Sequence, residues 1–76
     1  MIKLIKIKNE GNKIIYSFET TNVNEKGTIS LDAETKEMKL LHVPEELKFI
    51  AVKAYSALRY MLKNAGISDE YTYAWY

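Results

Sequence analysis

The sequence predicts an α+β domain of two layers, in which one long helix covers a four-stranded antiparallel β-meander. The first observation is the stretch 44–65, whose apolar residues recur at the spacing of one helix face. The second is the occurrence of short segments rich in β-branched and aromatic residues, which predict strands at about 2–8, 13–20, 27–32 and 37–42. The third is that short, turn-forming connections join these segments, which favours pairing between neighbours in the sequence. No repeat or linker interrupts the 76 residues, so we expect a single domain, 1–76.

The predicted helix has a well-marked beginning and end. Pro44 suits a first helical turn, where a missing N–H costs nothing, and Glu45 and Glu46 place negative charge at the positive end of the helix dipole. Gly66 can take the left-handed conformation that closes a helix. The face expected to be buried consists of Leu47, Ile50, Ala51, Ala54, Leu58, Met61, Leu62 and Ala65.

The first predicted strand departs from strict alternation at Leu4 and Ile5. We expect a β-bulge at that step, which would turn Ile7 toward the same buried face as Ile2. The lysines of this strand would discourage further pairing if it lies at the edge of the sheet. After it, Gly11 can take the positive φ of a tight turn into the second strand.

The other three strands alternate regularly between apolar and polar residues. The alternation predicts that the buried face carries Ile14, Tyr16 and Phe18, then Ile29 and Leu31, then Met38 and Leu40. Between the last two strands, Asp32 is placed to cap the backbone donors of a type I turn, and Lys36 stands where a glycine would fit more comfortably.

A second apolar line runs along the reverse face of the predicted helix. Phe49, Val52, Ser56 and Tyr60 form this line, and Arg59 lies beside it. A helix in a simple monomer would be polar there, so the line predicts an interface, either with a second copy crossing near the small Ser56 or with the C-terminal tail. The alternative is that these are single exposed apolar side chains, which are common on protein surfaces.

The C-terminal segment 71–76 is unusually aromatic and predicts an aromatic tail or a short strand. Tyr71, Tyr73 and Trp75 would share one side of an extended chain, and Tyr76 follows. We expect this segment to dock on the sheet edge or on the second line of the helix, and we place its aromatic residues among the candidate interface or ligand-binding residues. The alternative is that they only complete the core or a homodimer contact.

Composition narrows the classes of function. The formal net charge is +1, which implies no electrostatic partner for the molecule as a whole. The chain contains no cysteine, its N-terminus lacks a signal-peptide pattern, and no segment is apolar enough for a membrane span, so we expect a cytoplasmic protein without membrane contact. A chain of this size buries only about 60 % of its unfolded surface, which favours a homodimer or a higher homo-oligomer.

No catalytic, metal or cofactor motif is present in the sequence. His42 is the sole histidine, and with Glu45 and Glu46 nearby it lacks a second histidine for a metal and an orienting acid for catalysis. The three glycines are separated, so no phosphate-binding loop is formed. We therefore expect no enzyme, no metal and no cofactor, and a binding module remains by elimination.

A single-stranded nucleic-acid-binding protein is the alternative function. Four lysines lie on the predicted first hairpin, namely Lys3, Lys6, Lys8 and Lys13. Phosphates bind cations and unpaired bases stack on aromatic rings, so this hairpin and the aromatic tail would supply both kinds of contact. Against it, ten acidic residues offset eleven basic ones, and lysines on an exposed strand face often serve solubility.

The composition, the element order, the DAETKEMKL hairpin and the YTYAWY ending together resemble small uncharacterised proteins of low-GC Gram-positive bacteria and their phages. The resemblance extends over most of the chain and brings no site residues with it. It implies a non-enzymatic inhibitor, encoded by a phage or mobile element, that binds a host protein or sequesters a small ligand.

Overall fold

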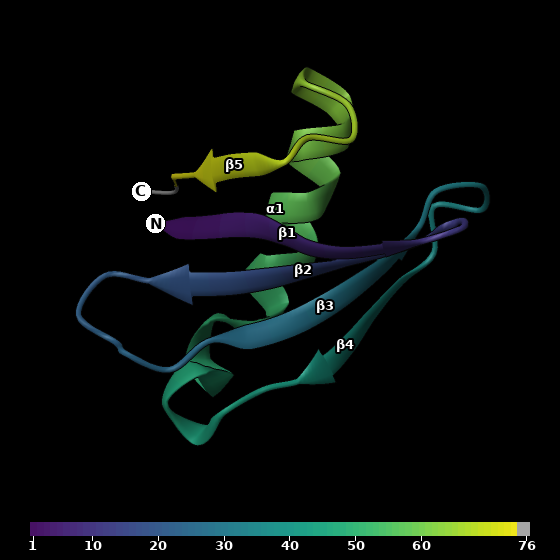
Figure 1. Cartoon of the computed structure of the whole chain (residues 1–76). Helices are drawn as coiled ribbons and strands as arrows, with labels where there is room; N and C mark the ends of the chain where they lie inside the picture. Colours follow the sequence, from purple (N-terminus) through teal and green to yellow (C-terminus); the bar gives the residue numbers. More distant parts are fainter. Residues whose placement is uncertain (75–76) are drawn as a thin grey trace.

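In the computed structural model, which describes residues 1–74, five strands form one antiparallel sheet and a helical segment covers one of its faces (Figure 1). The elements in chain order are β1 (Ile2–Glu10), β2 (Lys13–Thr20), β3 (Gly27–Asp32), β4 (Met38–His42), the 3₁₀ helix η1 (Glu45–Ile50), the α-helix α1 (Ala51–Asn64) and β5 (Glu70–Tyr73). The strand order in space is β4-β3-β2-β1-β5. The α+β class and the meander are confirmed, and the count of four strands is wrong by one because β5 pairs with β1.

The strand β1 is an interior strand, and its bulge lies beyond the expected position. The register with β2 shifts between Lys6 and Lys8, so Ile7 is the extra residue and its side chain is 56 % exposed. The expected bulge at Leu4 and Ile5 is therefore wrong. Leu4 stays on the core face without it, and Lys6 follows on that same face because it lies opposite the buried Tyr16.

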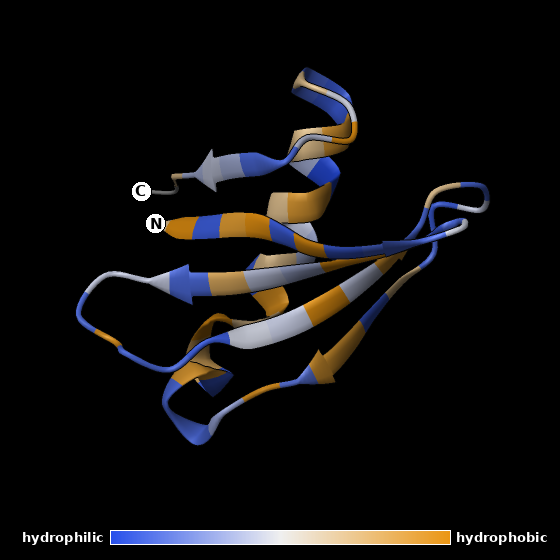
Figure 2. Ribbon diagram, viewed as in Figure 1, coloured by the Kyte–Doolittle hydropathy of each residue, from blue (hydrophilic) through white to orange (hydrophobic). Residues whose placement is uncertain are grey.

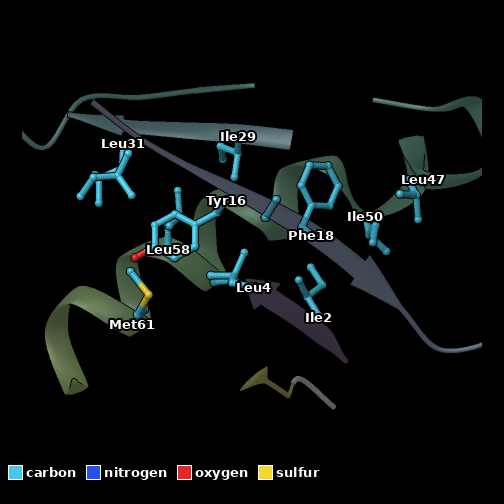
Figure 3. Packing of buried hydrophobic residues seen from close by; sticks show 13 residues of the cluster. Ile2, Leu4, Tyr16, Phe18, Ile29, Leu31, Leu47, Ile50, Leu58 and Met61 are labelled. Atoms are coloured by element: carbon cyan, nitrogen blue, oxygen red, sulfur yellow. The ribbon is translucent and has the colours of Figure 1, made fainter. Parts of the chain in front are cut away.

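The core lies between the sheet and the helical segment, and the inward residues of β2 and β3 are those that the alternation predicts (Figure 3). The large, fully buried side chains are Ile2, Leu4, Tyr16, Phe18, Ile29, Leu31, Leu47, Ile50, Leu58 and Met61. Phe18 lies opposite Gly27 in the register of β2 and β3, and its ring occupies the space that a Cβ on Gly27 would need. Met38 and Leu40 of β4 are half-buried and pack against this core, as expected.

The turn between β3 and β4 is confirmed as an Asp-capped turn. The Asp32 carboxylate accepts hydrogen bonds from the backbone N–H groups of Glu34 at 2.8 Å and Thr35 at 2.9 Å. These bonds favour the charged form, so they hold the pKa of Asp32 below its ordinary value of 3.8. Lys36 takes the left-handed conformation, with φ of 65°, at the position where a glycine was expected to fit better.

The helical segment is not one continuous α-helix over 44–65, as the sequence predicts. Its first turns form η1, in which the Leu47 N–H donates to the Pro44 carbonyl at 2.9 Å. Tight 3₁₀ turns are frequent at helix N-termini, and Ile50 marks the junction with α1. At the other end Gly66 is in the left-handed conformation, with φ of 74°, as expected. Ala57 is buried although the predicted face omitted it.

The side chains of Tyr16 and Lys6 hold the loop before β5 against the sheet. The hydroxyl of the fully buried Tyr16 donates to the Ser68 carbonyl at 2.6 Å. Lys6 forms an ion pair with Asp69 at 2.7 Å, and its backbone N–H donates to the Asp69 carbonyl at 2.8 Å. The Lys6 hydrogen bond and charge lower the pKa of Asp69, whereas burial raises the pKa of Tyr16. The C-terminal strand is thus part of the fold.

Within residues 1–74, the other face of the sheet has no helix over it. Apolar and polar residues alternate along the central strands, as the colours of Figure 2 show. Ser17 and Ser30 alternate with core residues and are nearly buried, and their hydroxyls approach the carbonyls of Ile5 and Lys39 at 3.5 and 3.4 Å. Ile5 and Ile15 lie on this face beside the serines and are half-buried, so both are less exposed than Phe49 and Val52 on the outer side of the helix.

Candidate recognition surface on the outer side of the helix

The second apolar line of the helix faces away from the sheet. We call Phe49, Val52, Ser56 and Tyr60 the outer stripe. Phe49 is 71 % exposed, Val52 is 75 % exposed and Tyr60 is 46 % exposed. The inner side of the same helical segment is fully buried, so burial against the sheet determines how α1 is rotated and which residues are left outside. The stripe begins in η1 and continues along α1.

The C-terminal strand covers one end of the outer stripe. The rings of Tyr60 and Tyr73 are stacked, with 5.0 Å between their centroids and 21° between their planes. Tyr71, on the same side of β5, is half-buried, and its hydroxyl accepts a hydrogen bond from the Asn64 side chain at 3.4 Å. Docking on the sheet edge and docking on the stripe were predicted as alternatives, and both occur. Trp75 and Tyr76 lie outside the described residues.

A shallow hollow of about 240 Å³ adjoins Tyr60. Among the described residues, its lining consists of Arg59, Tyr60 and Lys63. Arg59 and Lys63 are one helical turn apart, and the Arg59 guanidinium donates to the Ser56 hydroxyl at 3.4 Å. The stack with Tyr73 supports the Tyr60 ring from the side of β5. Two cations and a supported aromatic ring thus lie together at the C-terminal end of the stripe.

Charge is unevenly distributed along the outer side of the helical segment. In η1, Glu45 pairs with Lys48 at 2.9 Å, and the neighbouring Glu46 is also exposed. The sequence of α1, AVKAYSALRYMLKN, contains three basic residues and no acidic residue. The stripe therefore runs from an end that bears carboxylates to an end that bears only cations.

The four lysines of the nucleic-acid alternative are divided between the two faces of the sheet. The strand register places Lys6 on the side of the helix, and Lys3, Lys8 and Lys13 on the uncovered side. Lys3 lies 4.0 Å from Glu70, and Lys8 lies 3.3 Å from Glu10, so their charges are partly offset. Tyr71 and Tyr73 lie on the helix side, so the structure does not bring them together with the lysines of the uncovered side.

The described residues form neither a metal-binding cluster nor a helix that could span a membrane. Residues 1–74 contain no group of three histidine, aspartate or glutamate side chains that could hold a metal ion. His42 is exposed at the end of β4. In the same residues, no helix has the length and apolar character that crossing a membrane requires.

Sequence reasoning missed three contacts that shape this surface. The stack of Tyr60 on Tyr73 and the hydrogen bond of Tyr16 to Ser68 both depend on β5 crossing to β1, which the pattern of the first strands does not indicate. The pairing of Lys6 with Asp69 depends on the position of the bulge. The one available signal was the high β-propensity of the aromatic ending, which allowed a short strand.

Comparisons with protein-family models, curated proteins and solved structures found no match to this chain. The outer stripe and the hollow beside it are therefore the features that indicate a function.

Proposed function

We propose that this chain is a non-catalytic binding module that recognises a partner protein through the outer stripe. The observation that supports the proposal is the exposure of Phe49 and Val52, at 71 % and 75 %, on a helix whose inner side is fully occupied. Burying apolar surface contributes about 25 cal/mol for each Å² removed from water. Aromatic anchors also lose little side-chain entropy on binding, so these residues suit the centre of an interface.

The most concrete form of the proposal is an inhibitor, encoded by a phage or mobile element, that binds and blocks a host protein. The resemblance to small proteins of low-GC Gram-positive bacteria and their phages supports this context. Such an inhibitor needs a firmly held surface and no chemistry of its own. The buried inner face of α1 and the strand β5 support the outer stripe in this way.

Sequestration of a small ligand is less well supported than protein binding. The hollow beside Tyr60 has a volume of about 240 Å³. Pockets that enclose a small molecule usually have about 300–1,000 Å³ and surround most of its surface. A hollow bounded by one helix face is a better seat for one side chain of a partner protein.

The nucleic-acid alternative also has less support than protein binding. Its lysines occupy both faces of the sheet, and three of the four lie near a carboxylate. The homodimer or higher homo-oligomer remains a prediction, which sedimentation of the chain alone would test. A second copy would compete with the partner protein for the same stripe.

Affinity capture from lysate of a low-GC Gram-positive host tests the proposal. The wild-type chain is compared with a Phe49→Glu, Val52→Glu variant and with Ile7→Glu as a matched control. Ile7 is a similarly exposed apolar residue on β1, outside the stripe. We expect the same host protein to be retained by the wild type and by Ile7→Glu and to be lost with the stripe variant. Equal retention by all three folded chains would remove the proposal.

A further inference from the structure

We infer that the partner segment bound on the outer stripe is acidic, with apolar anchors over Phe49 and Val52 and carboxylates in the hollow at Arg59 and Lys63. The inference rests on the proposed function and adds the chemistry of the partner. It joins two features that lie on one side of the helix, the apolar part of the stripe and the cationic hollow.

The first argument is the charge of α1. All ten acidic residues of the chain lie outside α1, although the chain as a whole carries a formal charge of only +1. Arg59 and Lys63 are both exposed and line the hollow. Opposite charges across an interface favour association and fix its orientation. A helix face that bears cations without carboxylates beside exposed apolar residues therefore fits an acidic, partly apolar segment.

The second argument is the geometry of the hollow. Arg59 and Lys63 are separated by one helical turn, so their cationic groups can bind two carboxylates spaced by one turn of a partner helix. One guanidinium hydrogen bond goes to Ser56, and guanidinium has five N–H donors, so others remain for a carboxylate. The Tyr60 ring, stacked on Tyr73, forms a firm wall beside both cations.

A protein fits the whole stripe better than a nucleic acid or an anionic membrane. Val52 is aliphatic and offers no ring on which a base could stack. At the η1 end, Glu45 and Glu46 would repel a continuous polyanion, and Glu45 already pairs with Lys48. A protein segment can place apolar side chains over one end of the stripe and carboxylates over the other.

A second copy of the chain is the competing occupant. An isologous contact across the stripe brings the same surface of both copies together. In an antiparallel contact, the end of the stripe that bears Glu45 and Glu46 would face the cations of the other copy, but Glu45 already pairs with Lys48 at 2.9 Å. A second copy would therefore offer Arg59 and Lys63 a carboxylate already shared with Lys48, whereas a segment of an unlike partner can be acidic throughout.

A pair of synthetic peptides tests the inference. The first is an amphipathic helix with leucine and phenylalanine anchors flanked by glutamates, and the second has lysine in place of every glutamate. Each is titrated into the isotope-labelled full chain, and amide NMR shifts are followed up to low millimolar peptide. We expect the acidic peptide to shift the amides of Val52, Ser56 and Tyr60, and the basic peptide to bind more weakly by about tenfold or more.

Charge exchange separates specific pairing from damage to the fold. An Arg59→Glu, Lys63→Glu variant should lose affinity for the acidic peptide by about tenfold and gain affinity for the basic one. The matched control, Lys13→Glu with Lys39→Glu, makes the same change in net charge at exposed lysines outside α1 and should retain the wild-type preference.

Several results would overturn the inference. The first is that the two peptides bind equally well. The second is that neither peptide shifts the amides of the outer stripe. The third is that these amides shift with the concentration of the chain when no peptide is present. Stronger stripe shifts with an oligothymidine or with phosphatidylglycerol vesicles than with the acidic peptide would also overturn it. If any of these occurred while the Phe49→Glu, Val52→Glu variant still lost its host protein, the proposed function would stand and only the acidic partner would be excluded.

Discussion

The ring of Tyr73 stacks on the ring of Tyr60, with 5.0 Å between their centroids. Tyr73 belongs to β5, and Tyr60 belongs to α1, so this contact joins the last strand to the surface that we propose binds a partner. It also explains why Tyr60 is less exposed than Phe49 and Val52 at the other end of the stripe. The strand β5 therefore both extends the sheet and supports the Tyr60 ring that lines the hollow.

The stack should contribute measurably to stability. Such aromatic pairs are worth about 0.5–1.5 kcal/mol beyond the area that they bury. A double-mutant cycle with Tyr60→Leu and Tyr73→Leu, followed by denaturant unfolding, should give a coupling free energy of about 1 kcal/mol. Strictly additive effects of the two substitutions would show that the rings do not interact in solution.

The ion pair of Lys6 with Asp69 should make stability depend on pH in acid. The pKa of Asp69 is held below 3.8 by Lys6 in the folded chain, so the unfolded chain binds a proton at higher pH. The stabilisation is complete above the ordinary pKa and is lost as the pH falls through the lowered one. In an NMR titration, Lys6→Met should return the pKa of Asp69 toward 3.8. The lowered pKa of Asp32 should stay unchanged, and an unaltered Asp69 would contradict the role of Lys6.

Gly27 should tolerate no side chain. Gly27 lies opposite Phe18, and the Phe18 ring occupies the space that a Cβ on Gly27 would need. The ring is fully buried, so it has no exposed position to move into. Gly27→Ala should destabilise the chain by about 1–3 kcal/mol, because an overpacked core must shift its neighbours. The loss of stability caused by Gly27→Ala should be smaller in a Phe18→Leu background, because the ring is absent there. A loss of the same size in both backgrounds would point to the backbone at Gly27 instead.

Local signals predicted the fold well wherever the determining contacts are also local. The Asp32 cap, the left-handed Lys36 and the left-handed Gly66 all follow from residue chemistry within one turn. The position of the bulge does not, because it depends on Lys6 remaining opposite Tyr16, a partner ten residues away in the sequence. The partition of the helix into η1 and α1 was also missed, since periodicity does not distinguish short 3₁₀ turns from α-helix.

The candidate surface was predicted in part for the same reason. Helical spacing alone located Phe49, Val52 and Tyr60 on the side away from the sheet, and the structure exposes all three. The hollow is lined by Arg59, Tyr60 and Lys63, and support for its Tyr60 ring depends in addition on the return of β5 along β1. That return is a long-range pairing between the two ends of the chain, and the sequence offered only a high β-propensity as evidence for it.

Lys36 occupies a backbone conformation that favours glycine. Its φ of 65° carries a penalty of about 1–2 kcal/mol for a residue with a Cβ, while glycine loses about 0.5–1 kcal/mol more in chain entropy. Lys36→Gly should therefore raise the free energy of unfolding by up to about 1 kcal/mol. Lys36→Ala also removes the contact of the Lys36 amine with the Ala33 carbonyl but keeps the Cβ, so it should give no such gain. Equal gains in both variants would assign the effect to the lost amine.

The hydroxyl of Tyr16 should stabilise the chain at neutral pH and limit its stability in alkali. It donates to the Ser68 carbonyl at 2.6 Å, and loss of one such hydrogen bond in Tyr16→Phe should cost about 1 kcal/mol. Burial, and then the charge of Asp69, raise the pKa of Tyr16 above its ordinary value of 10.0. The unfolded chain thus releases this proton first, so the stabilisation is complete below that value and is lost as the pH rises through the raised pKa.

Denaturant unfolding of the wild type and Tyr16→Phe at neutral and alkaline pH measures both effects. We expect the stability advantage of the wild type to shrink as the pH rises past the ordinary tyrosine pKa. The other tyrosines are present in both proteins, so their contributions cancel in the comparison. Tyr55→Phe removes a half-buried hydroxyl that accepts a bond from the Leu40 N–H at 3.3 Å, and it provides the matched control. If the difference in the free energy of unfolding between the wild type and Tyr16→Phe is the same at every pH, Tyr16 does not ionise in this way. Only a hydroxyl that loses its proton can make this difference depend on pH.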